Sequence, residues 1–347
     1  MSEQKFLTYL KDMSPLFGVS GDEAPVREYI KEQLKGKVDE MFEDALGSLV
    51  VLKKGKSAPK QRLMIDAHID EVGFMVSEIT EDGYLKFQVV GSINDKVILG
   101  RRVYVGEQQL PGVIGTKPIH LQSAEEKKTP VPVEDMYIDI GANDQAQAEQ
   151  YVMLGDRVMF DSEFVEFGDH RIKGKAFDDR AAVALLMELA QSDLKYDTWF
   201  SFSTQEEIGG YGAKTAAARV NPDLTIVVET TSAADVPFIE GTRRTCIQKQ
   251  GPSIVYADKK TIYPRDLFKH VFALAKEQKI KVQPKTSVAG STNAGIIRVN
   301  GCGAKAIGVS MPCRYIHSGS CMLCTEDMEE TYRLLKALTE ELQDQEW

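Results

Sequence analysis

The sequence predicts an α/β fold that is interrupted by a small β-barrel-like domain. Apolar residues at helical spacing alternate with short, wholly apolar runs in residues 1–72 and again in residues 165–347. Residues 73–164 instead show brief apolar runs divided by glycines and turns, a pattern typical of an all-β domain. We therefore expect one α/β domain built from residues 1–72 and 165–347, with residues 73–164 inserted into it as a separate β domain.

The N-terminal part of the chain predicts two helices followed by two strands. Residues 5–34 carry apolar side chains at helical spacing on both sides of a short break, and Ser20 or Asp22 is a suitable N-cap for the second helix. Residues 49–52 and 62–67 predict strands. The second of these is almost wholly apolar, so we expect it to be buried.

The α/β pattern resumes near Lys175 and predicts five further elements. They are a helix at residues 181–194, strands at 199–203 and 225–228, an amphipathic helix at 263–279 and a long helix at 326–342. Within the inserted region, the polar residues 122–129 predict a loop between strands.

The composition excludes several classes of partner. A formal net charge of -10 over 347 residues argues against nucleic acid or an anionic membrane as the main partner. Hydrophobic and charged contents of 43% and 27% are ordinary for a soluble globular protein. No uncharged stretch of about 18 apolar residues occurs, so we expect no membrane span. Residues 1–5 lack the basic and apolar segments of a signal peptide, and we expect a cytoplasmic protein.

Four of the five cysteines lie between Cys302 and Cys324, and this grouping allows two interpretations. Cys321 and Cys324 form a C-x-x-C pair close to His317, which is compatible with a zinc half-site or a redox pair. A structural zinc site would need a second close pair, which the sequence lacks, and an odd number of cysteines does not suit a disulfide framework. We therefore expect reduced cysteines packed in the C-terminal segment.

The candidate site residues follow apolar runs in five separated fragments. His68 comes directly after the predicted strand 62–67, at the edge of an α/β sheet where ligands and catalytic groups gather. Asp70 lies two residues on and shares a face with His68 in an extended chain, so it can hold the ring nitrogen that is not given to a metal. A histidine hydrogen-bonded within a loop is the alternative, but the flanking aspartates favour ligation.

Two pairs of adjacent carboxylates offer further ligands. Asp178 and Asp179 precede a predicted helix, where one carboxylate can bridge two cations or, alternatively, simply cap the helix. Glu206 and Glu207 follow an apolar strand, so one can bind a metal while the other accepts a proton from the bound water. A solvated acidic turn is the alternative for this pair, but it fits poorly at the end of a hydrophobic strand.

Glu229 and His317 complete the candidate set. Glu229 follows the predicted strand 225–228, where a buried carboxylate is costly unless it is paired or metal-bound, and Asp235 is a competing candidate farther from the strand. His317 supplies the second imidazole. Two imidazoles and several carboxylates can hold two neighbouring metal ions, and they suit zinc, cobalt or manganese better than calcium.

These fragments, in this order and spacing, resemble the M42 family of metallo-aminopeptidases, the group of glutamyl and tetrahedral aminopeptidases. The resemblance runs nearly end to end. Its motifs stand at residues 15–21, 66–73, 112–121, 136–142 and 174–180.

The resemblance implies a mixed-sheet peptidase domain that holds two divalent ions per subunit, zinc first and cobalt or manganese as alternatives. By that resemblance Asp178 bridges the two ions. His68 and Glu229 complete one site, and Glu207 and His317 complete the other.

The resemblance also implies catalytic roles, substrates and assembly. Glu206 would be the general base, Asp70 would orient His68, and the peptide between Asp178 and Asp179 would be cis. Substrates would be short peptides that lose N-terminal residues. The inserted domain would drive formation of homo-oligomers, from dimers to dodecamers.

Three departures from the family pattern leave other functions open. Glu229 stands where the family more often has Asp, and the segment after His317 differs from the usual one. Asn293 replaces an Asp, which could weaken recognition of a substrate ammonium group or unsettle the residues around the site. The alternatives are an amidase or deacylase that acts on non-peptide amides with the same site, and a non-catalytic assembly protein.

Overall fold

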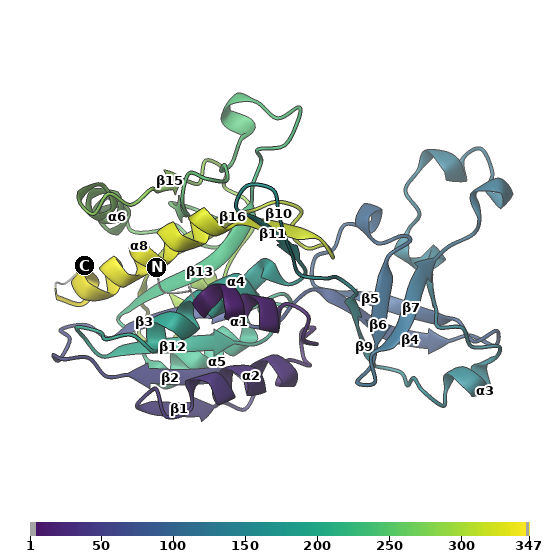
Figure 1. The fold of residues 1–347 in the computed structure, drawn as a ribbon, viewed down its shortest axis with the longest axis horizontal. Coiled ribbons are helices and arrows are strands. Elements are labelled where there is room, and N and C mark those ends of the chain that lie inside the picture. Colours follow the sequence, from purple (N-terminus) through teal and green to yellow (C-terminus); the bar gives the residue numbers. More distant parts are fainter. Residues whose placement is uncertain (1–4, 345–346) are drawn as a thin grey trace.

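The protein has two lobes, an α/β body and a β-barrel joined to it (Figure 1). The structure, a computed structural model, describes residues 5–344 and residue 347. Residues 1–4, which contribute to the argument against a signal peptide, lie outside the described part of the chain.

An eight-stranded mixed sheet forms the centre of the body, as the α/β fold class predicts. Its four central strands run parallel, because helices connect them across the faces of the sheet, while their outer neighbours on each side run antiparallel. In spatial order the strands are β1 (Glu40–Glu43), β2 (Leu49–Lys53), β12 (Thr198–Ser203), β3 (Leu63–His68), β13 (Leu224–Ser232), β16 (Lys305–Cys313), β14 (Ser253–Val255) and β15 (Gln283–Pro284).

Helices cover both faces of this sheet. Side chains of successive strand residues point to opposite faces. In β3, Leu63 and Ile65 accordingly join the larger core, while Met64 joins the core on the other face. The larger core contains α1 (Lys5–Met13), α2 (Ala24–Leu34), α4 (Phe177–Ala190), α6 (Arg265–Glu277) and α8 (Thr325–Glu341). The smaller core contains α5 (Tyr211–Val220) and α7 (Ala294–Ile297).

The start of α4 differs from the prediction. The predicted helix 181–194 begins at Phe177 and ends at Ala190. Its first turn is irregular, because Asp178 and Asp179 have non-helical backbone angles and the peptide bond between them is cis. The apolar periodicity on which the prediction rested reports only the regular part of a helix.

The cap predicted for α2 is wrong. Neither Ser20 nor Asp22 caps this helix, because it begins after Glu23, which makes no side-chain capping bond, and it has Pro25 in its first turn. Ser20 instead donates a hydrogen bond from Oγ to Asp70 Oδ2 at 2.6 Å.

The inserted region forms a closed six-stranded barrel. Three phenylalanines fill its interior, with the ring of Phe74 packed edge-on against Phe87 and Phe160 at centroid distances of 5.0 and 5.2 Å. The strands, in order around the barrel, are β4 (Gly73–Ile79), β5 (Leu85–Val90), β8 (Tyr137–Asp139), β7 (Leu110–Gly115), β6 (Arg102–Val105) and β9 (Arg157–Phe160).

Short elements connect these parts. A three-stranded sheet of β10 (Val165–Phe167), β11 (Arg171–Gly174) and β17 (Cys321–Cys324) lies beside the body. The polar loop 122–129 contains one 3-10 turn. The remaining short helices are α3 (Gln145–Ala148), η1 (Asp95–Val97), η2 (Ile119–Leu121), η3 (Glu126–Lys128), η4 (Val133–Asp135), η5 (Gly241–Arg243) and η6 (Leu342–Asp344).

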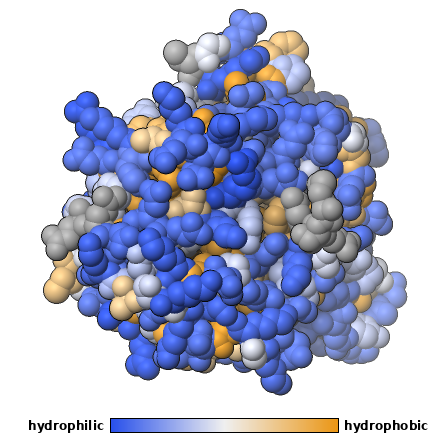
Figure 2. Space-filling model, turned by 60° about the vertical axis from the view of Figure 1, so that its left-hand side comes forward, coloured by the Kyte–Doolittle hydropathy of each residue, from blue (hydrophilic) through white to orange (hydrophobic). Residues whose placement is uncertain are grey.

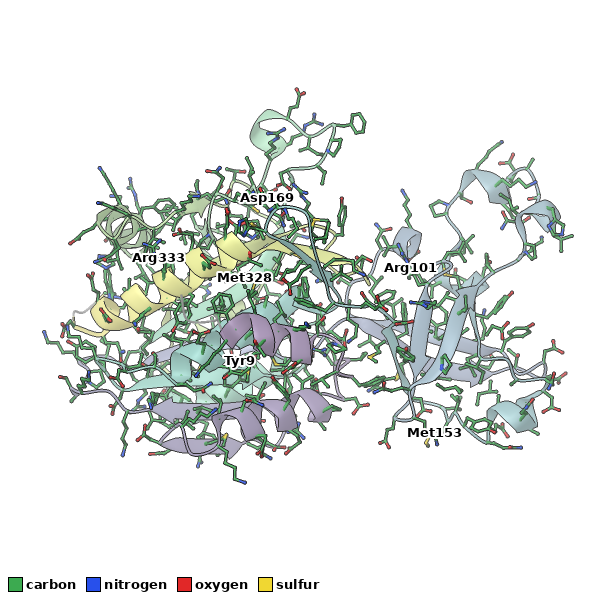
Figure 3. The ribbon with its side chains drawn as sticks, viewed as in Figure 1. Tyr9, Arg101, Met153, Asp169, Met328 and Arg333 are labelled. Atoms are coloured by element: carbon green, nitrogen blue, oxygen red, sulfur yellow. The ribbon has the colours of Figure 1, made fainter. Side chains whose placement is uncertain are left out.

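The expectation of packed cysteines is met only in part, because Cys302 is exposed whereas the other four cysteines are buried. In the part of the chain that the structure describes, no helix is long and apolar enough to cross a membrane. All five cysteines are described and none forms a disulfide; Cys321 and Cys324 are buried in β17. Figure 2 shows hydrophilic residues over most of the face of the body that it presents. Figure 3 shows Tyr9 of α1 and Met328 of α8 in the body, and Arg101 and Met153 in the barrel.

Candidate metal centre

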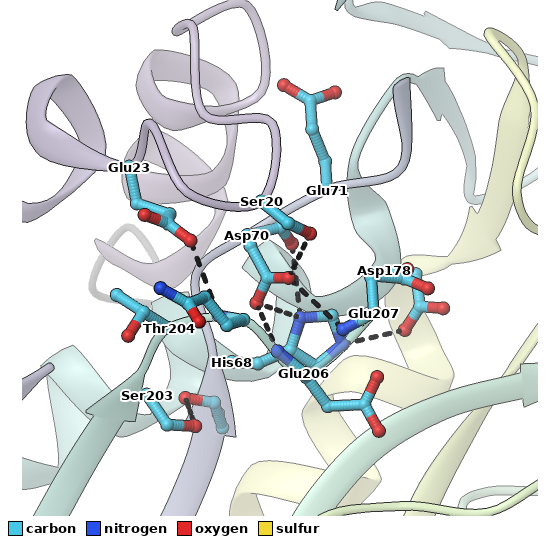
Figure 4. Close-up of polar contacts among 12 residues, drawn as sticks. Ser20, Glu23, His68, Asp70, Glu71, Asp178, Ser203, Thr204, Glu206 and Glu207 are labelled. Atoms are coloured by element: carbon cyan, nitrogen blue, oxygen red, sulfur yellow. Dashed lines mark hydrogen bonds and ion pairs between the residues drawn. The ribbon is translucent and has the colours of Figure 1, made fainter. Parts of the chain in front are cut away.

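The predicted site residues converge at the carboxyl end of the parallel strands, and Figure 4 shows His68, Asp178, Glu206 and Glu207 close together there. His68 is the last residue of β3, and Glu206 and Glu207 follow β12. Asp178 lies in the irregular first turn of α4, and His317 lies in the loop between β16 and β17. This convergence follows from the topology, because parallel strands deliver their carboxyl ends to one edge of the sheet.

The carboxylate of Asp178 lies between the two imidazoles. Its Oδ1 is 3.6 Å from Nε2 of His68, and its Oδ2 is 3.0 Å from Nε2 of His317. One oxygen therefore faces each ring, which is the arrangement that a carboxylate needs to bridge two cations.

Each imidazole has a second carboxylate beside it. Nε2 of His68 is 3.5 Å from Oε2 of Glu229, and Nε2 of His317 is 3.4 Å from Oε1 of Glu207. The five predicted ligands thus form two adjoining groups, in which Asp178 is the shared member.

The prediction that a strand ends at Glu229 is wrong. β13 continues through Thr230 and Thr231 to Ser232, paired with β16 throughout. β-Branched threonines suit a strand, and pairing with a long neighbour extends it beyond the apolar run. Glu229 reaches His68 from within the strand rather than from its end.

Several oxygens of this cluster are buried without a hydrogen-bond donor among the described residues. They are Oδ1 of Asp178, both carboxylate oxygens of Asp179, Oε1 of Glu207 and Oε1 of Glu229. Buried carboxylate oxygens are costly unless a cation or donor compensates them. Imidazoles with carboxylates suit zinc, cobalt or manganese, so the donor set fits divalent ions at this place.

The electrostatics also indicate a cluster that lacks positive charge. Burial and the charge of Asp178 raise the pKa of Glu207 to about 8, even though His317 opposes this shift. Burial raises the pKa of Glu229 to about 7. Burial lowers the pKa of His317, but its hydrogen bond to Asp178 and the charge of Glu207 outweigh this and raise the pKa to about 10. The carboxylates and imidazoles therefore hold protons at a pH where a bound cation would displace them.

Asp179 is a site residue that the sequence did not identify as a candidate ligand. It is fully buried, and its carboxylate can join His68 and Glu229 in a group with metal-binding geometry. A second group of this kind contains His68, Asp178 and Glu207. The only signal in the sequence was the adjacency of the two aspartates.

Asp70 connects His68 to both glutamates of the pair. Its Oδ1 lies 3.3 Å from Nδ1 of His68, which places it where the prediction requires. The same carboxylate accepts hydrogen bonds from the backbone N–H groups of Glu206 at 2.9 Å and Glu207 at 3.1 Å, and from Ser20 Oγ (Figure 4). Asp70 is therefore positioned to orient three members of the cluster, whereas the sequence predicted only the contact with His68.

The backbone of the inserted region reaches His317. Nδ1 of His317 lies 2.8 Å from the carbonyl oxygen of Ser92, which follows β5 of the barrel. His317 itself has a φ of 56°, in the left-handed region that residues with a Cβ seldom adopt. The sequence could not identify Ser92, because a backbone carbonyl leaves no signature in residue type.

The side chain of Glu206 remains free to act on a substrate. It lines a cavity of about 490 Å³ together with His68, Asp178, Glu207 and His317. Its carboxylate forms no hydrogen bond or ion pair with any residue that the structure describes. Burial and the charge of Glu229 raise its pKa well above the usual value, so it holds a proton readily once it has accepted one.

Two other candidates lie away from this cavity. Asp235 forms a bidentate ion pair with Arg314, with distances of 2.7 and 2.8 Å. Asn293 is buried and donates hydrogen bonds from Nδ2 to Asp66 at 2.8 Å and Ser203 at 3.0 Å. Of the two effects expected from this replacement, the contact with Asp66 favours the one on the residues around the site over recognition of a substrate ammonium. An amide suits this position, because it can donate to the buried Asp66 carboxylate.

A comparison with protein-family models matches residues 47–334 to the M42 glutamyl aminopeptidase family. The chain is 30% identical to the lysyl aminopeptidase of Pyrococcus furiosus, over 94% of each chain. It is 28% identical to the glutamyl aminopeptidase of Lactococcus lactis subsp. cremoris, over 95% of this chain and 94% of the other.

Solved structures share the whole fold. The TET aminopeptidase of Thaumarchaeota archaeon SCGC AB-539-E09 is 35% identical, with a TM-score of 0.93 over 97% of this chain and 96% of that one. The TET1 peptidase of Pyrococcus horikoshii, which can assemble into a tetrahedron or a large octahedral shell, is 31% identical. Its TM-score is 0.85 over 97% of this chain and 99% of that one.

Proposed function

The chain belongs to the M42 glutamyl aminopeptidase family, and we propose that it removes N-terminal residues from short peptides with the help of two divalent metal ions per subunit. Aminopeptidase activity and metal dependence follow from family membership. That each subunit binds two ions is our own proposal. The main observation in its support is that Asp178 turns one carboxylate oxygen towards each of two imidazoles.

We assign five residues as ligands. Asp178 would bridge the two ions, His68 and Glu229 would hold one of them, and Glu207 and His317 would hold the other. Zinc is our first candidate for the metal, and cobalt and manganese are the alternatives that the same ligands accommodate.

The residues of the chain divide the remaining work. Bound divalent ions supply Lewis acidity, which polarises a peptide carbonyl and lowers the pKa of water. The carboxylate of Glu206 accepts the proton from the attacking water and delivers it to the nitrogen of the leaving amine. Asp70 holds the ring of His68 and the backbone of Glu206, so the base keeps its position relative to the ligands.

We also propose a division of labour between the lobes. Residues 1–72 and 165–347 form the catalytic domain, and residues 73–164 form an inserted domain through which copies of the chain assemble. The assembly of the Pyrococcus horikoshii TET1 peptidase, which has the same fold over almost the full chain, supports a homo-oligomer.

The test uses purified protein that is stripped of metal and then reloaded with zinc, cobalt or manganese. We expect about two ions per chain and metal-dependent release of p-nitroaniline from aminoacyl-p-nitroanilides. N-acyl amino acids belong in the same panel, because their hydrolysis in place of the aminoacyl substrates would indicate a deacylase. Protein that binds no metal and stays inactive after reloading would contradict the proposal and favour a non-catalytic role.

A further inference from the structure

The cavity beside the metal cluster has a basic and polar wall. Apart from glycines, Ala289 and Ile316 are the only apolar residues in the lining of this cavity among the residues that the structure describes. Lys259, Lys260 and Lys285 lie in the same lining, which also contains several hydroxyl groups. Pockets for apolar side chains are lined mainly by hydrophobic and aromatic residues, so this cavity does not suit a leucine or phenylalanine side chain.

Backbone hydrogen bonds fix the loops that carry these lysines. The N–H of Lys285 donates to the carbonyl of Ile254 in β14 at 3.0 Å. The N–H of Lys259 donates to the carbonyl of Gly290, also at 3.0 Å. The basic wall is therefore tied to the central sheet rather than formed by independent surface side chains.

Lys285 differs from the two other lysines because it is buried. Only 7% of its surface is exposed, whereas Lys259 and Lys260 are exposed at the rim. Its Nζ donates one hydrogen bond, to the carbonyl of Ala289 at 3.1 Å. It forms no ion pair with a carboxylate among the described residues. An ammonium group has three donors, so two remain for a ligand in the cavity.

A buried ammonium without an anionic partner is costly. Burial lowers the pKa of Lys285, although Asp258, Cys246 and Glu229 oppose this effect from a distance. A carboxylate that enters the cavity would supply the missing partner. The five predicted metal ligands line the same cavity as Lys285, so a peptide whose first residue is held at these ligands can extend its side chain towards the basic wall.

Membership of the family does not settle which N-terminal residue is preferred, because one relative is named a lysyl and another a glutamyl aminopeptidase. Resting on the proposed aminopeptidase function, we propose that Lys285 binds the side-chain carboxylate of the first residue of the substrate. The enzyme therefore prefers peptides that begin with Glu or Asp, and Lys259 and Lys260 add attraction at the rim.

The experiment compares Glu-p-nitroanilide with its uncharged isostere Gln-p-nitroanilide on the metal-loaded enzyme. We expect kcat/KM for the Glu substrate to be at least about tenfold higher. Lys285→Met should lower kcat/KM for the Glu substrate at least about tenfold while changing that for the Gln substrate less than about threefold. Turnover of the Gln substrate shows that the variant is folded and holds its metals.

Lys281→Met is the matched control. Lys281 is exposed and does not line the cavity, and its replacement changes the net charge by the same amount. We expect the ratio of the two kcat/KM values to stay as in the unchanged enzyme. A second variant, Lys285→Gln, retains a donor for the Ala289 carbonyl and should show the same loss for the Glu substrate if the charge is what matters.

Failure of this inference is distinguishable from failure of the proposed function. An enzyme that is silent on every aminoacyl substrate would overturn both. Equal turnover of the Glu and Gln substrates, with activity present, would overturn only the role of Lys285. The same holds if Lys285→Met weakens all substrates equally.

A carboxylate could also come from the C-terminus of a very short peptide. The dipeptide Gln-Leu and its C-terminal amide separate this source from the N-terminal side chain. If Lys285→Met impairs Gln-Leu but not its amide, and leaves the Glu to Gln ratio unchanged, then Lys285 binds the C-terminus and the stated preference is wrong. We expect equal effects on the dipeptide and the amide.

Discussion

The two halves of the metal centre are built in different ways. The first half belongs to the sheet, since His68 ends β3 and Glu229 lies within β13. The second half belongs to loops, since Glu207 follows β12 and His317 lies between β16 and β17. The side chain of His68 is 1% exposed, whereas that of His317 is 28% exposed.

The supports of the two imidazoles differ in the same way. His68 is oriented by Asp70, a carboxylate two residues away on the same segment. His317 is oriented by the carbonyl of Ser92, which belongs to the inserted region and lies 225 residues away in the sequence. The sheet and its neighbouring residues therefore hold the first half in place. The second half depends on the loop of His317 and the segment of Ser92, which are far apart in the sequence, keeping their relative position. The predictions below test this difference.

The largest expected effect comes from removing the carboxylate that we propose as the general base. Glu206→Gln should lower kcat at least about a hundredfold, because an amide cannot accept the proton of the attacking water, while the metal content stays unchanged. Turnover and metal analysis of the same preparation check this. Glu240→Gln, at an exposed position, is the matched control and should behave as the unchanged enzyme. Near-normal turnover of Glu206→Gln would remove it from the mechanism.

The next effect concerns the residue that connects the halves. Asp70→Asn should lower metal affinity or kcat about tenfold to a hundredfold. The Asp70 carboxylate accepts hydrogen bonds from Ser20 and from the N–H groups of Glu206 and Glu207, and the NH2 group of an asparagine would face these donors with another donor. Ser20→Ala removes one of those donors and should cost less. If Ser20→Ala and Asp70→Asn prove equally harmful, Asp70 does not act through His68 and the two glutamate N–H groups.

Chelation should separate the two halves directly. We expect two phases of metal loss, with the ion at Glu207 and His317 leaving at least about ten times faster, because that half is more exposed and its histidine is held by one remote carbonyl. His317→Ala should abolish the fast phase and keep the slow one. Release of both ions in one phase from the unchanged enzyme would mean that the halves are energetically equivalent.

The smallest expected effect is the pH dependence of the metal-free protein. Glu207 and Glu229 have pKa values of about 8 and about 7, above their usual value of 4.5, so the folded state holds protons that the unfolded state releases. Their stabilising contribution is complete below pH 4.5 and is lost as the pH rises through 7 and 8. The raised pKa of His317 acts in the same direction.

We therefore expect the unfolding temperature of metal-free protein to fall by at least about 3 °C relative to the metal-loaded protein between about pH 5 and pH 9. Glu229→Gln should remove the part of this fall near pH 7, and Glu207→Gln the part near pH 8. Parallel curves for metal-free and metal-loaded protein would contradict this account of the cluster.

The same contrast between sheet and loop separates what the sequence could predict from what it could not. The apolar run at residues 62–67 correctly predicted the buried strand β3 with His68 at its end. This was possible because burial of a strand on both faces requires apolar residue types, which the sequence shows directly. Glu229 was identified as a candidate ligand, but the predicted end of strand β13 was placed too early because Thr230 and Thr231 are not apolar. Asp179 was seen only as the neighbour of Asp178, and nothing in the sequence indicated that it lies beside His68 and Glu229.

Interactions made by the backbone or by distant polar residues stayed beyond prediction. The Ser92 carbonyl has no signature, and Ser20 looked like a helix cap although it donates to Asp70. For Asn293 the sequence left two effects open, on substrate recognition or on the residues around the site, and only its burial against Asp66 favours the second. In each case the side chain or carbonyl finds its partner only through the tertiary fold.

The hydrogen bond between His317 and the Ser92 carbonyl has a consequence for protein engineering. A shortened enzyme made by joining the residue before β4 to the residue after β9 would delete this carbonyl together with the barrel, even though the five ligand side chains lie outside the barrel strands. A transplanted barrel would likewise have to present a carbonyl at this place to keep His317 aligned. The inserted region therefore cannot be removed or exchanged freely. A minimal enzyme of this type must retain the segment of backbone that follows β5, because it carries the Ser92 carbonyl.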